Sequence, residues 1–248
     1  MLAVEVTPSV FLAIATAAFL IGLAKGGLSG LGPLLTLLVA TVVPTKVAIG
    51  VLLPLLMVGD VAALVAHHGR WNRPILVRLL PGAAVGVAFA SFFLQSVSET
   101  ALQWMLAIFT MGFVVFRLAE PAIRQRANRS VPGPRWAAAA GVASGVTSTV
   151  AHVGGPPISV YLLAARVEPR PFVATTAALF FLINWMKVPG YLSAGLFDVD
   201  LILTIWPVVV LIGPGILVGR WFVTVVEQHV FDRFILASLM VGAILLLV

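Results

Sequence analysis

Eight apolar stretches, separated by charged residues or by glycine and proline, account for most of this 248-residue chain. They fall at residues 9–43, 46–66, 74–95, 100–118, 136–165, 172–193, 201–226 and 232–248. A helix needs roughly 20 residues to cross the ~30 Å hydrocarbon core of a bilayer, and most of these stretches have about that length. The pattern predicts an all-α polytopic membrane protein.

Composition excludes most soluble classes of protein. Hydrophobic residues make up 61% of the chain and charged residues 10%, whereas soluble domains have about 45–50% and about 25%. The mean hydropathy is +1.12. A soluble enzyme or a nucleic-acid-binding protein is therefore excluded. The chain has no cysteine, which excludes disulfides and thiolate chemistry.

Two of the stretches, 9–43 and 136–165, are too long for one crossing and too short for two. Each is interrupted by glycine and proline, in Lys25–Pro33 (KGGLSGLGP) and in His152–Pro157 (HVGGPP). Such clusters end helices. We expect each stretch to form a re-entrant hairpin, in which two half-helices meet at an irregular tip inside the protein.

The distribution of arginine supports the hairpins. If both stretches turn back, all twelve arginines lie in or beside the loops 67–73, 119–135, 166–171 and 227–231, on one side of the membrane. The positive-inside rule makes that side cytoplasmic, so both termini are expected outside the cytoplasm. The basic stretch 119–135 is then a topology signal and a lipid-headgroup contact, not a nucleic-acid site. The opening segment lacks the basic start of a signal peptide, and we expect it to be retained.

The two halves of the chain resemble each other. Gly32-Pro33 recurs as Gly155-Pro156, and the P-G-x-x-x-G of residues 81–86 recurs at 214–219. We expect an N-terminal repeat, 1–118, with hairpin 9–43 and spans 46–66, 74–95 and 100–118. A cytoplasmic linker, 119–135, precedes a C-terminal repeat, 136–248, with hairpin 136–165 and spans 172–193, 201–226 and 232–248.

Each half of the chain has three spans, which is an odd number, so the two repeats must be inverted relative to each other. Secondary transporters often have this design, with the substrate site where broken helices meet. The glycines at 82, 86, 215 and 219 are better explained by close packing of helices.

The glycine-rich motifs resemble those of a known family. They are G-G-L-S-G-L-G-P in the first tip, G-x-x-S-G-x-x-S-T-x-x-H-x-G-G-P-P from Gly141 to Pro157, and the P-G-x-x-x-G pair. From about residue 10 to 245 the chain resembles the TauE/SafE sulfite-exporter family. The resemblance implies a permease for small sulfur-containing anions such as sulfite, sulfonates or sulfoacetate, in a bacterial plasma (inner) membrane. A cysteine relay, which related thiosulfate carriers are thought to use, is excluded here.

Independently of the family, both tips suit an oxyanion. A buried anion needs hydrogen-bond donors, and the starts of the second half-helices, near Pro33 and Pro156, offer backbone N–H groups. Glycines would let the backbone approach the ligand, and hydroxyls could add donors unless they bond to their own helix. The candidates are Gly26, Gly27, Gly30, Gly32, Gly154, Gly155, Ser29, Ser148 and Thr149.

Ionisable residues within apolar segments are costly and often functional. Lys25 and His152 flank the tips, where either could neutralise the substrate, and Lys187 follows Asn184 in the stretch 172–193. Lys25 and Lys187 could instead snorkel to an interface, and His152 could simply bond to backbone. Asp60 could carry a coupling proton or pair with a lysine. No metal or cofactor is expected.

Other function classes stay open at this stage. Gly27-Leu28-Ser29-Gly30 matches the G-x-S-G of rhomboid intramembrane proteases, and Asp60 could serve a proton or metal-cation permease. Neither is favoured, because the second tip lacks the serine and a cage of carboxylates is not visible. Since there is no P-loop, we expect a secondary transporter and not an enzyme. The lipid bilayer is its partner, and a coupling proton or sodium ion and a homodimer stay open.

Overall fold

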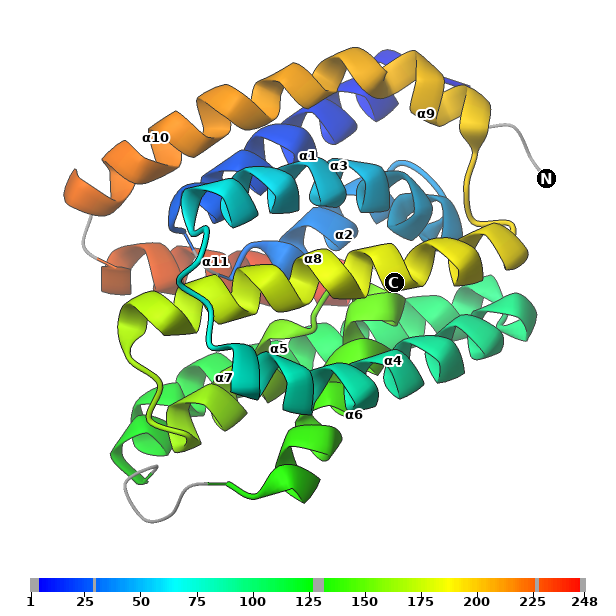
Figure 1. Cartoon of the computed structure of the whole chain (residues 1–248). Helices are drawn as coiled ribbons and strands as arrows, with labels where there is room; N and C mark the ends of the chain where they lie inside the picture. Colours follow the sequence, from blue (N-terminus) through cyan, green and yellow to red (C-terminus); the bar gives the residue numbers. More distant parts are fainter. Residues whose placement is uncertain (1–4, 29, 127–131, 226–227, 246–248) are drawn as a thin grey trace.

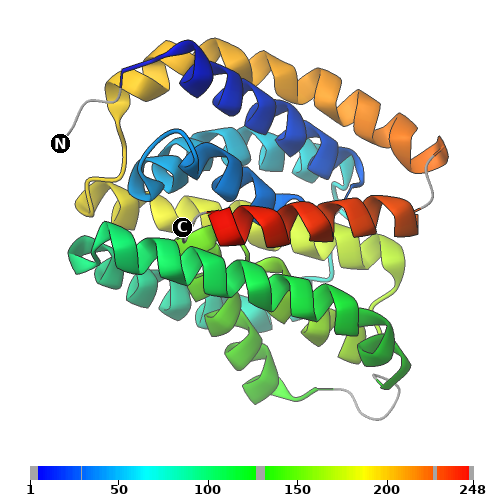
Figure 2. The same cartoon turned by 180° about the vertical axis from the view of Figure 1, so that it is seen from behind.

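The protein is a bundle of helices (Figures 1 and 2). The computed structural model describes residues 5–28, 30–126, 132–225 and 228–245, and regular structure within them is entirely helical, which confirms the all-α prediction. The elements are α1 (Pro8–Gly26), α2 (Gly32–Ala40), α3 (Thr45–Ala66), α4 (Arg73–Ser96), α5 (Glu99–Arg126), α6 (Pro134–Ala151), α7 (Gly155–Ala164), α8 (Pro169–Ser193), α9 (Val199–Ile205), the 3₁₀ helix η2 (Trp206–Leu211), α10 (Ile212–Val225) and α11 (Gln228–Leu245).

Among the described residues, six helical segments are long and apolar enough to span a membrane. Five coincide with predicted spans, namely those of α3, α4, α5, α8 and the run α9–η2–α10. The sixth is α1, which was expected to be one arm of a hairpin. The predicted span 232–248 corresponds to α11, of which only a shorter apolar piece, 235–244, is described in full.

Both interrupted stretches break where the glycines and prolines lie, but their arms are unequal. The first arms, α1 and α6, have 19 and 18 residues, while the returning arms α2 and α7 have 9 and 10. The expectation of two half-helices therefore holds only for the returning arms. Between Ser9 and Lys25, helix α1 contains a single glycine, Gly22, and no proline, so it runs on until Gly27. In Figures 1 and 2 the turn after α1 lies short of the end reached by α10 and α11.

The helix ends beside the arginine-rich segments gather at one end of the bundle. In Figure 1 the C-terminal ends of α3, α5, α7 and α10 lie toward the left, whereas the start of α1 and the C-terminal ends of α4 and α8 lie toward the right. The backbone N–H of Asn72 donates to the Thr175 hydroxyl at 2.9 Å, which ties the start of α4 to that of α8. Helix α5 continues to Arg126, so the connection to α6 is shorter than the predicted linker 119–135.

Glycines allow two pairs of helices from opposite halves to pack closely. A Cβ atom at Gly22 of α1 would lie 2.3 Å from the Ile212 carbonyl oxygen of α10, and one at Gly82 of α4 would lie 2.2 Å from that of Ala138 of α6. The P-G-x-x-x-G motifs therefore pack helices together. Each broken helix contacts the other half of the chain: α1 packs on α10, α6 on α4, α2 on α11 and α7 on α5.

Candidate functional site

The second tip is shaped by an unusual helix cap. Helix α6 is capped at its C-terminus by His152, whose φ of +55° and ψ of +28° place it in the left-handed region that glycine normally occupies. The N–H groups of His152 and Val153 donate back to the carbonyls of Ser148 and Thr147, at 3.0 and 3.2 Å. A non-glycine residue in this conformation is strained and often functional. The cap directs the histidine out of the helical path.

The first tip is capped by glycine. Helix α1 ends at Gly27 with a φ of +132°, and Lys25 lies in its last turn. The N–H of Leu28 closes the cap by donating to the Leu23 carbonyl at 3.2 Å. Glycine accepts this backbone conformation without strain. The charged group of the first tip therefore comes from the helix itself and not from its cap.

The two tips contact each other. The Thr36 hydroxyl of α2 donates to the carbonyl of Ala151, the last residue of α6, at 3.2 Å in a buried position. A Cβ atom at Gly32, where α2 begins, would lie 2.9 Å from the His152 carbonyl oxygen. Only glycine therefore allows the start of α2 to lie this close to the second tip.

A buried carboxylate links the first tip to helix α8. The Lys25 ammonium lies 2.5 Å from Asp60 Oδ1, and Asn184 Nδ2 donates to Asp60 Oδ2 at 2.6 Å. Asp60 is fully buried on α3, Asn184 is 5% exposed on α8, and the Lys25 side chain is 19% exposed. Both oxygens of the carboxylate thus have a donor, as a buried charge requires.

The same amide continues the chain of hydrogen bonds to the second tip. Lys187 Nζ donates to Asn184 Oδ1 at 2.8 Å and lies 3.3 Å from His152 Nδ1. The other ring nitrogen, His152 Nε2, lies 3.1 Å from the Ile49 carbonyl oxygen on α3. Five predicted residues therefore join in one chain across both halves: Lys25, Asp60, Asn184, Lys187 and His152.

We call these five hydrogen-bonded residues the polar chain. Their hydrogen-bond geometry determines which of the groups carry a charge. An ammonium group only donates, so His152 Nδ1 must accept from Lys187, and Nε2–H must donate to the Ile49 carbonyl. The histidine is then neutral. Lys25 and Asp60 cancel, which leaves the fully buried Lys187 with neutral acceptors and, among the described residues, without a carboxylate in contact. With Lys187 charged, the polar chain carries a net charge of +1.

The predicted hydroxyl donors are placed differently from one another. The buried Thr149 hydroxyl donates to the Gly145 carbonyl of its own helix at 2.7 Å, which was the alternative explanation. Ser148 is buried against Gly154, where an added Cβ would lie 2.8 Å from the serine Cβ. Ser29 lies outside the described residues, so the structure does not test the protease alternative that depends on this serine.

The predicted glycines differ in their surroundings. Gly26 packs against α10, where a Cβ would lie 2.6 Å from the Ile216 carbonyl oxygen, whereas a Cβ at Gly155 would meet nothing within 4 Å. Gly30 has a φ of +101° and faces the Phe113 ring. Gly26 therefore serves packing, and open space lies beside the start of α7.

Sequence reasoning missed three polar contacts that hold the second tip. The Tyr191 hydroxyl donates to the Thr149 carbonyl at 2.5 Å, and the Ser144 hydroxyl donates to the Gly154 carbonyl at 2.8 Å. The third is the Thr36 bond described above. Single hydroxyls in apolar helices were the available signal, but the sequence does not show which carbonyl each one meets.

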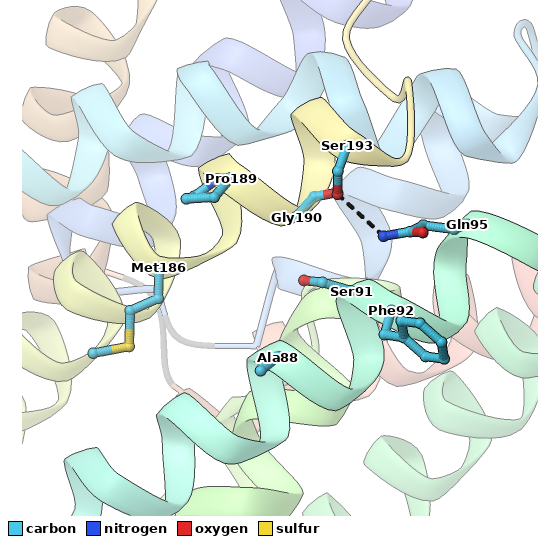
Figure 3. Close-up of a pocket in the computed structure, with 8 residues that line it drawn as sticks. All are labelled: Ala88, Ser91, Phe92, Gln95, Met186, Pro189, Gly190 and Ser193. Atoms are coloured by element: carbon cyan, nitrogen blue, oxygen red, sulfur yellow. Dashed lines mark hydrogen bonds between the residues drawn. The ribbon is translucent and has the colours of Figure 1, made fainter.

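A separate cavity of about 320 Å³ lies between α4 and α8 (Figure 3). It is lined by Ala88, Ser91, Phe92, Gln95, Met186, Pro189, Gly190 and Ser193. The buried Ser91 hydroxyl points into the gap between the helices without a hydrogen-bond partner, and Gln95 Nε2 donates to the Ser193 hydroxyl at 3.2 Å. This lining is uncharged, so it suits an anion less well than Lys187 does.

At the arginine-rich end, His67 directly follows α3. Partial burial and the neighbouring Arg70 and Arg220 lower the pKa of His67 below its usual value. The neutral form of this histidine is therefore favoured, because each further positive charge at this end repels the next.

A comparison with known families agrees with the architecture. A family model described as sulfite exporter TauE/SafE matches residues 10–246. No curated protein and no solved structure matches the chain. The match covers both broken helices and the whole polar chain between them. An integral membrane protein with six apolar candidate spans and this match is a transporter and not an enzyme, and the chain belongs to the TauE/SafE sulfite exporter family.

Proposed function

We propose that the protein is a secondary transporter that carries a small sulfur-containing anion, such as sulfite or an organosulfonate like sulfoacetate, past the contact of the two tips. The observation that carries the proposal is the buried ammonium of Lys187. Its contacts are Asn184 Oδ1 and His152 Nδ1, both neutral. A buried cation without a counter-ion is costly, and a bound oxyanion would supply the missing negative charge.

The tips supply donors of the kind that an oxyanion needs. Helices α2 and α7 begin at Gly32 and Gly155, so both present the partially positive end of a helix to the region where the tips meet. Gly155 is the only one of the first three residues of α7 with a backbone N–H, because Pro156 and Pro157 follow it. The open space beside Gly155 favours it as a backbone donor to the ligand.

Two inverted repeats would let this site face each side of the membrane in turn. The exchange of contacts between halves, α1 with α10 and α6 with α4, supports such a repeat. Alternating access would then rock one half against the other around the tips. The arginine-rich end would face the cytoplasm of a bacterial plasma membrane, with both termini outside.

A cation permease that uses Asp60 is less well supported. Both oxygens of this carboxylate already accept hydrogen bonds, from Lys25 and from Asn184. A metal cation would have to displace a lysine in direct contact, which opposes cation binding. Asp60 is better suited to respond to a proton, since protonation would release Lys25.

Flux and binding measurements on the purified protein test the proposal. Thermal stabilisation is screened with sulfite, sulfate, thiosulfate, sulfoacetate and taurine, and sulfite flux is measured in proteoliposomes. We expect stabilisation by at least one of the anions, and a loss of flux of about 100-fold in Lys187→Met. The matched control is Lys46→Met, because Lys46 lies about 21 Å along α3 from Asp60. Stabilisation by metal cations and by none of the anions would overturn the substrate class.

A further inference from the structure

Resting on the proposed function, we infer that Asp60 sets the charge of the anion that the site balances. With Asp60 ionised, the polar chain neutralises a monoanion such as a sulfonate or hydrogensulfite. With a proton on Asp60 it neutralises a dianion such as sulfite or sulfate. A dianion is therefore carried together with one proton, and a monoanion is carried without one.

The charge count follows from three groups. Lys25 and Asp60 are in direct contact at 2.5 Å and cancel, while Lys187 adds one positive charge. His152 is neutral, because its two nitrogens serve as one acceptor and one donor. Burial makes any uncompensated charge expensive, so the most favourable ligand is the one that brings the sum to zero. That sum is +1 with the carboxylate ionised and +2 with it protonated.

The Asn184 amide links the charged groups of Asp60 and Lys187 through hydrogen bonds. Its amide donates to Asp60 Oδ2 and accepts from Lys187 Nζ, so its orientation is fixed from both sides. When a proton from water forms an O–H bond on Asp60, the carboxyl group loses its charge and its attraction for Lys25. The Lys25 side chain is 19% exposed and lies at the first tip, whereas Asp60 and Lys187 are fully buried. Lys25 is therefore the cation that can turn toward a bound anion.

The groups that face Asp60 are known for each described neighbour of α3. Helix α1 presents Lys25, α8 presents Lys187 through Asn184, and the second tip places His152 against α3. Helix α2 has no titratable side chain. On α5, Glu99 bonds to the backbone N–H groups of Thr45 and Lys46 at the start of α3. Lys25 and Lys187 thus form the charged surroundings of Asp60.

Anions of constant charge make the inference testable. Methanesulfonate stays a monoanion and sulfate stays a dianion between pH 5 and 9, so a change in their relative affinity reports on the protein. Affinities are measured by calorimetry on the wild-type protein across this range. We expect the preference for sulfate over methanesulfonate to fall by up to about tenfold per pH unit, because binding of the dianion would take up a proton that binding of the monoanion does not. A preference that does not change with pH overturns the inference.

Three variants fix the charge of the site. Asp60→Asn has a sum of +2 and should prefer sulfate by about tenfold more than the wild type does near pH 8, without pH dependence. Lys25→Met with Asp60→Asn has a sum of +1 and should keep the low sulfate preference at every pH. Asp200→Asn, which changes an exposed acid on α9, should titrate like the wild type.

The double variant also guards against misfolding, because it removes both members of the ion pair and leaves neither charge unpaired. A double variant that titrates like the wild type overturns the inference even if Asp60→Asn does not fold. Failure of the proposed function looks different. In that case neither anion binds to the wild type, or Lys187→Met binds both anions as the wild type does.

Discussion

The two tips have the same design but differ in how they supply a polar group. Each first arm ends at a residue with positive φ, and each returning arm begins with glycine and proline. At the first tip the cap is Gly27, and the cation is Lys25 from the preceding turn. At the second tip His152 is both the cap and the side chain that joins the polar chain. A left-handed conformation costs a non-glycine residue roughly 1–2 kcal/mol. The conformation that places the His152 side chain therefore lowers the stability of the second tip.

The helices that follow the two hairpins, α3 and α8, also differ in the charged side chain that they place at the tips. Helix α3 presents an acid, Asp60, to the first tip, whereas α8 presents a base, Lys187, to the second. The first tip is consequently a neutral ion pair, and the second retains a positive charge when Lys187 is charged. On the proposed function, two halves with the same helical plan would have different roles: the first would respond to a proton, and the second would hold the anion.

The largest expected effect on stability comes from breaking the ion pair at the first tip. Lys25→Ala leaves Asp60 as a buried carboxylate without its cation, and we expect a loss of stability of about 3–5 kcal/mol. Thermal unfolding in detergent measures it, and Lys46→Ala is the matched control. Adding Asp60→Asn should restore most of the loss, because the unpaired charge is removed. If the double variant is as unstable as Lys25→Ala, the ion pair is not what stabilises the tip.

The next effect tests the glycine cap. Gly27→Ala places a Cβ in a backbone conformation with φ of +132°, which should cost about 1–3 kcal/mol. Anion affinity should change little once the protein is folded, because no polar side chain is lost. Gly133→Ala, at the N-cap of α6 with φ of −71° and open space, is the control that should cost less stability. Equal unfolding temperatures for the two variants would contradict the strain.

His152→Gly separates strain from function at the second tip. Relative to His152→Ala, His152→Gly should be more stable by about 1 kcal/mol, because both variants lose the same hydrogen bonds and only glycine relieves the left-handed strain. It should also reduce sulfite flux by about tenfold, because Lys187 loses an acceptor. His152→Ala should reduce flux similarly without the gain in stability. Wild-type kinetics in both variants would show that His152 has no role in transport.

The smallest effect concerns the contact between the tips. Thr36→Val removes the donor to the buried Ala151 carbonyl and should cost about 1 kcal/mol. Thr41→Val removes a similar bond to the Leu38 carbonyl at an exposed position, so it should cost less. Thermal unfolding of both variants compares them. A larger loss in Thr41→Val would mean that the contact of the tips adds little to stability.

Much of the plan could be predicted from the sequence. The breaks at Gly27 and His152 follow from glycine and proline, and the grouping of the arginines follows from the positive-inside rule. The lengths of the hairpin arms could not be predicted, because apolar runs look alike whether they end at mid-membrane or near its surface. The end of α5 was also missed, because the helix continues through Pro121 to Arg126.

The candidate site was predicted as a set of residues but not as a set of bonds. Lys25, Asp60, Asn184, Lys187 and His152 stood out because polar groups are costly within apolar helices. Which of them pair was open, and snorkelling remained an alternative for both lysines. For Lys25 and Lys187 that alternative was wrong, because each Nζ bonds within the bundle.

The sequence by itself determined that this chain is helical, where its helices break and which ionisable groups lie within them. The physical reason is local: a bilayer leaves the backbone no partner but itself, and glycine and proline interrupt that pairing. Only the tertiary structure decided that Asp60 neutralises Lys25 and leaves Lys187, within the described part of the chain, without a carboxylate in contact. Asp60 and Asn184 are 124 residues apart in the chain, and His152 and Ile49 are 103 apart. Such pairings depend on how helices from both halves pack, which no local pattern records.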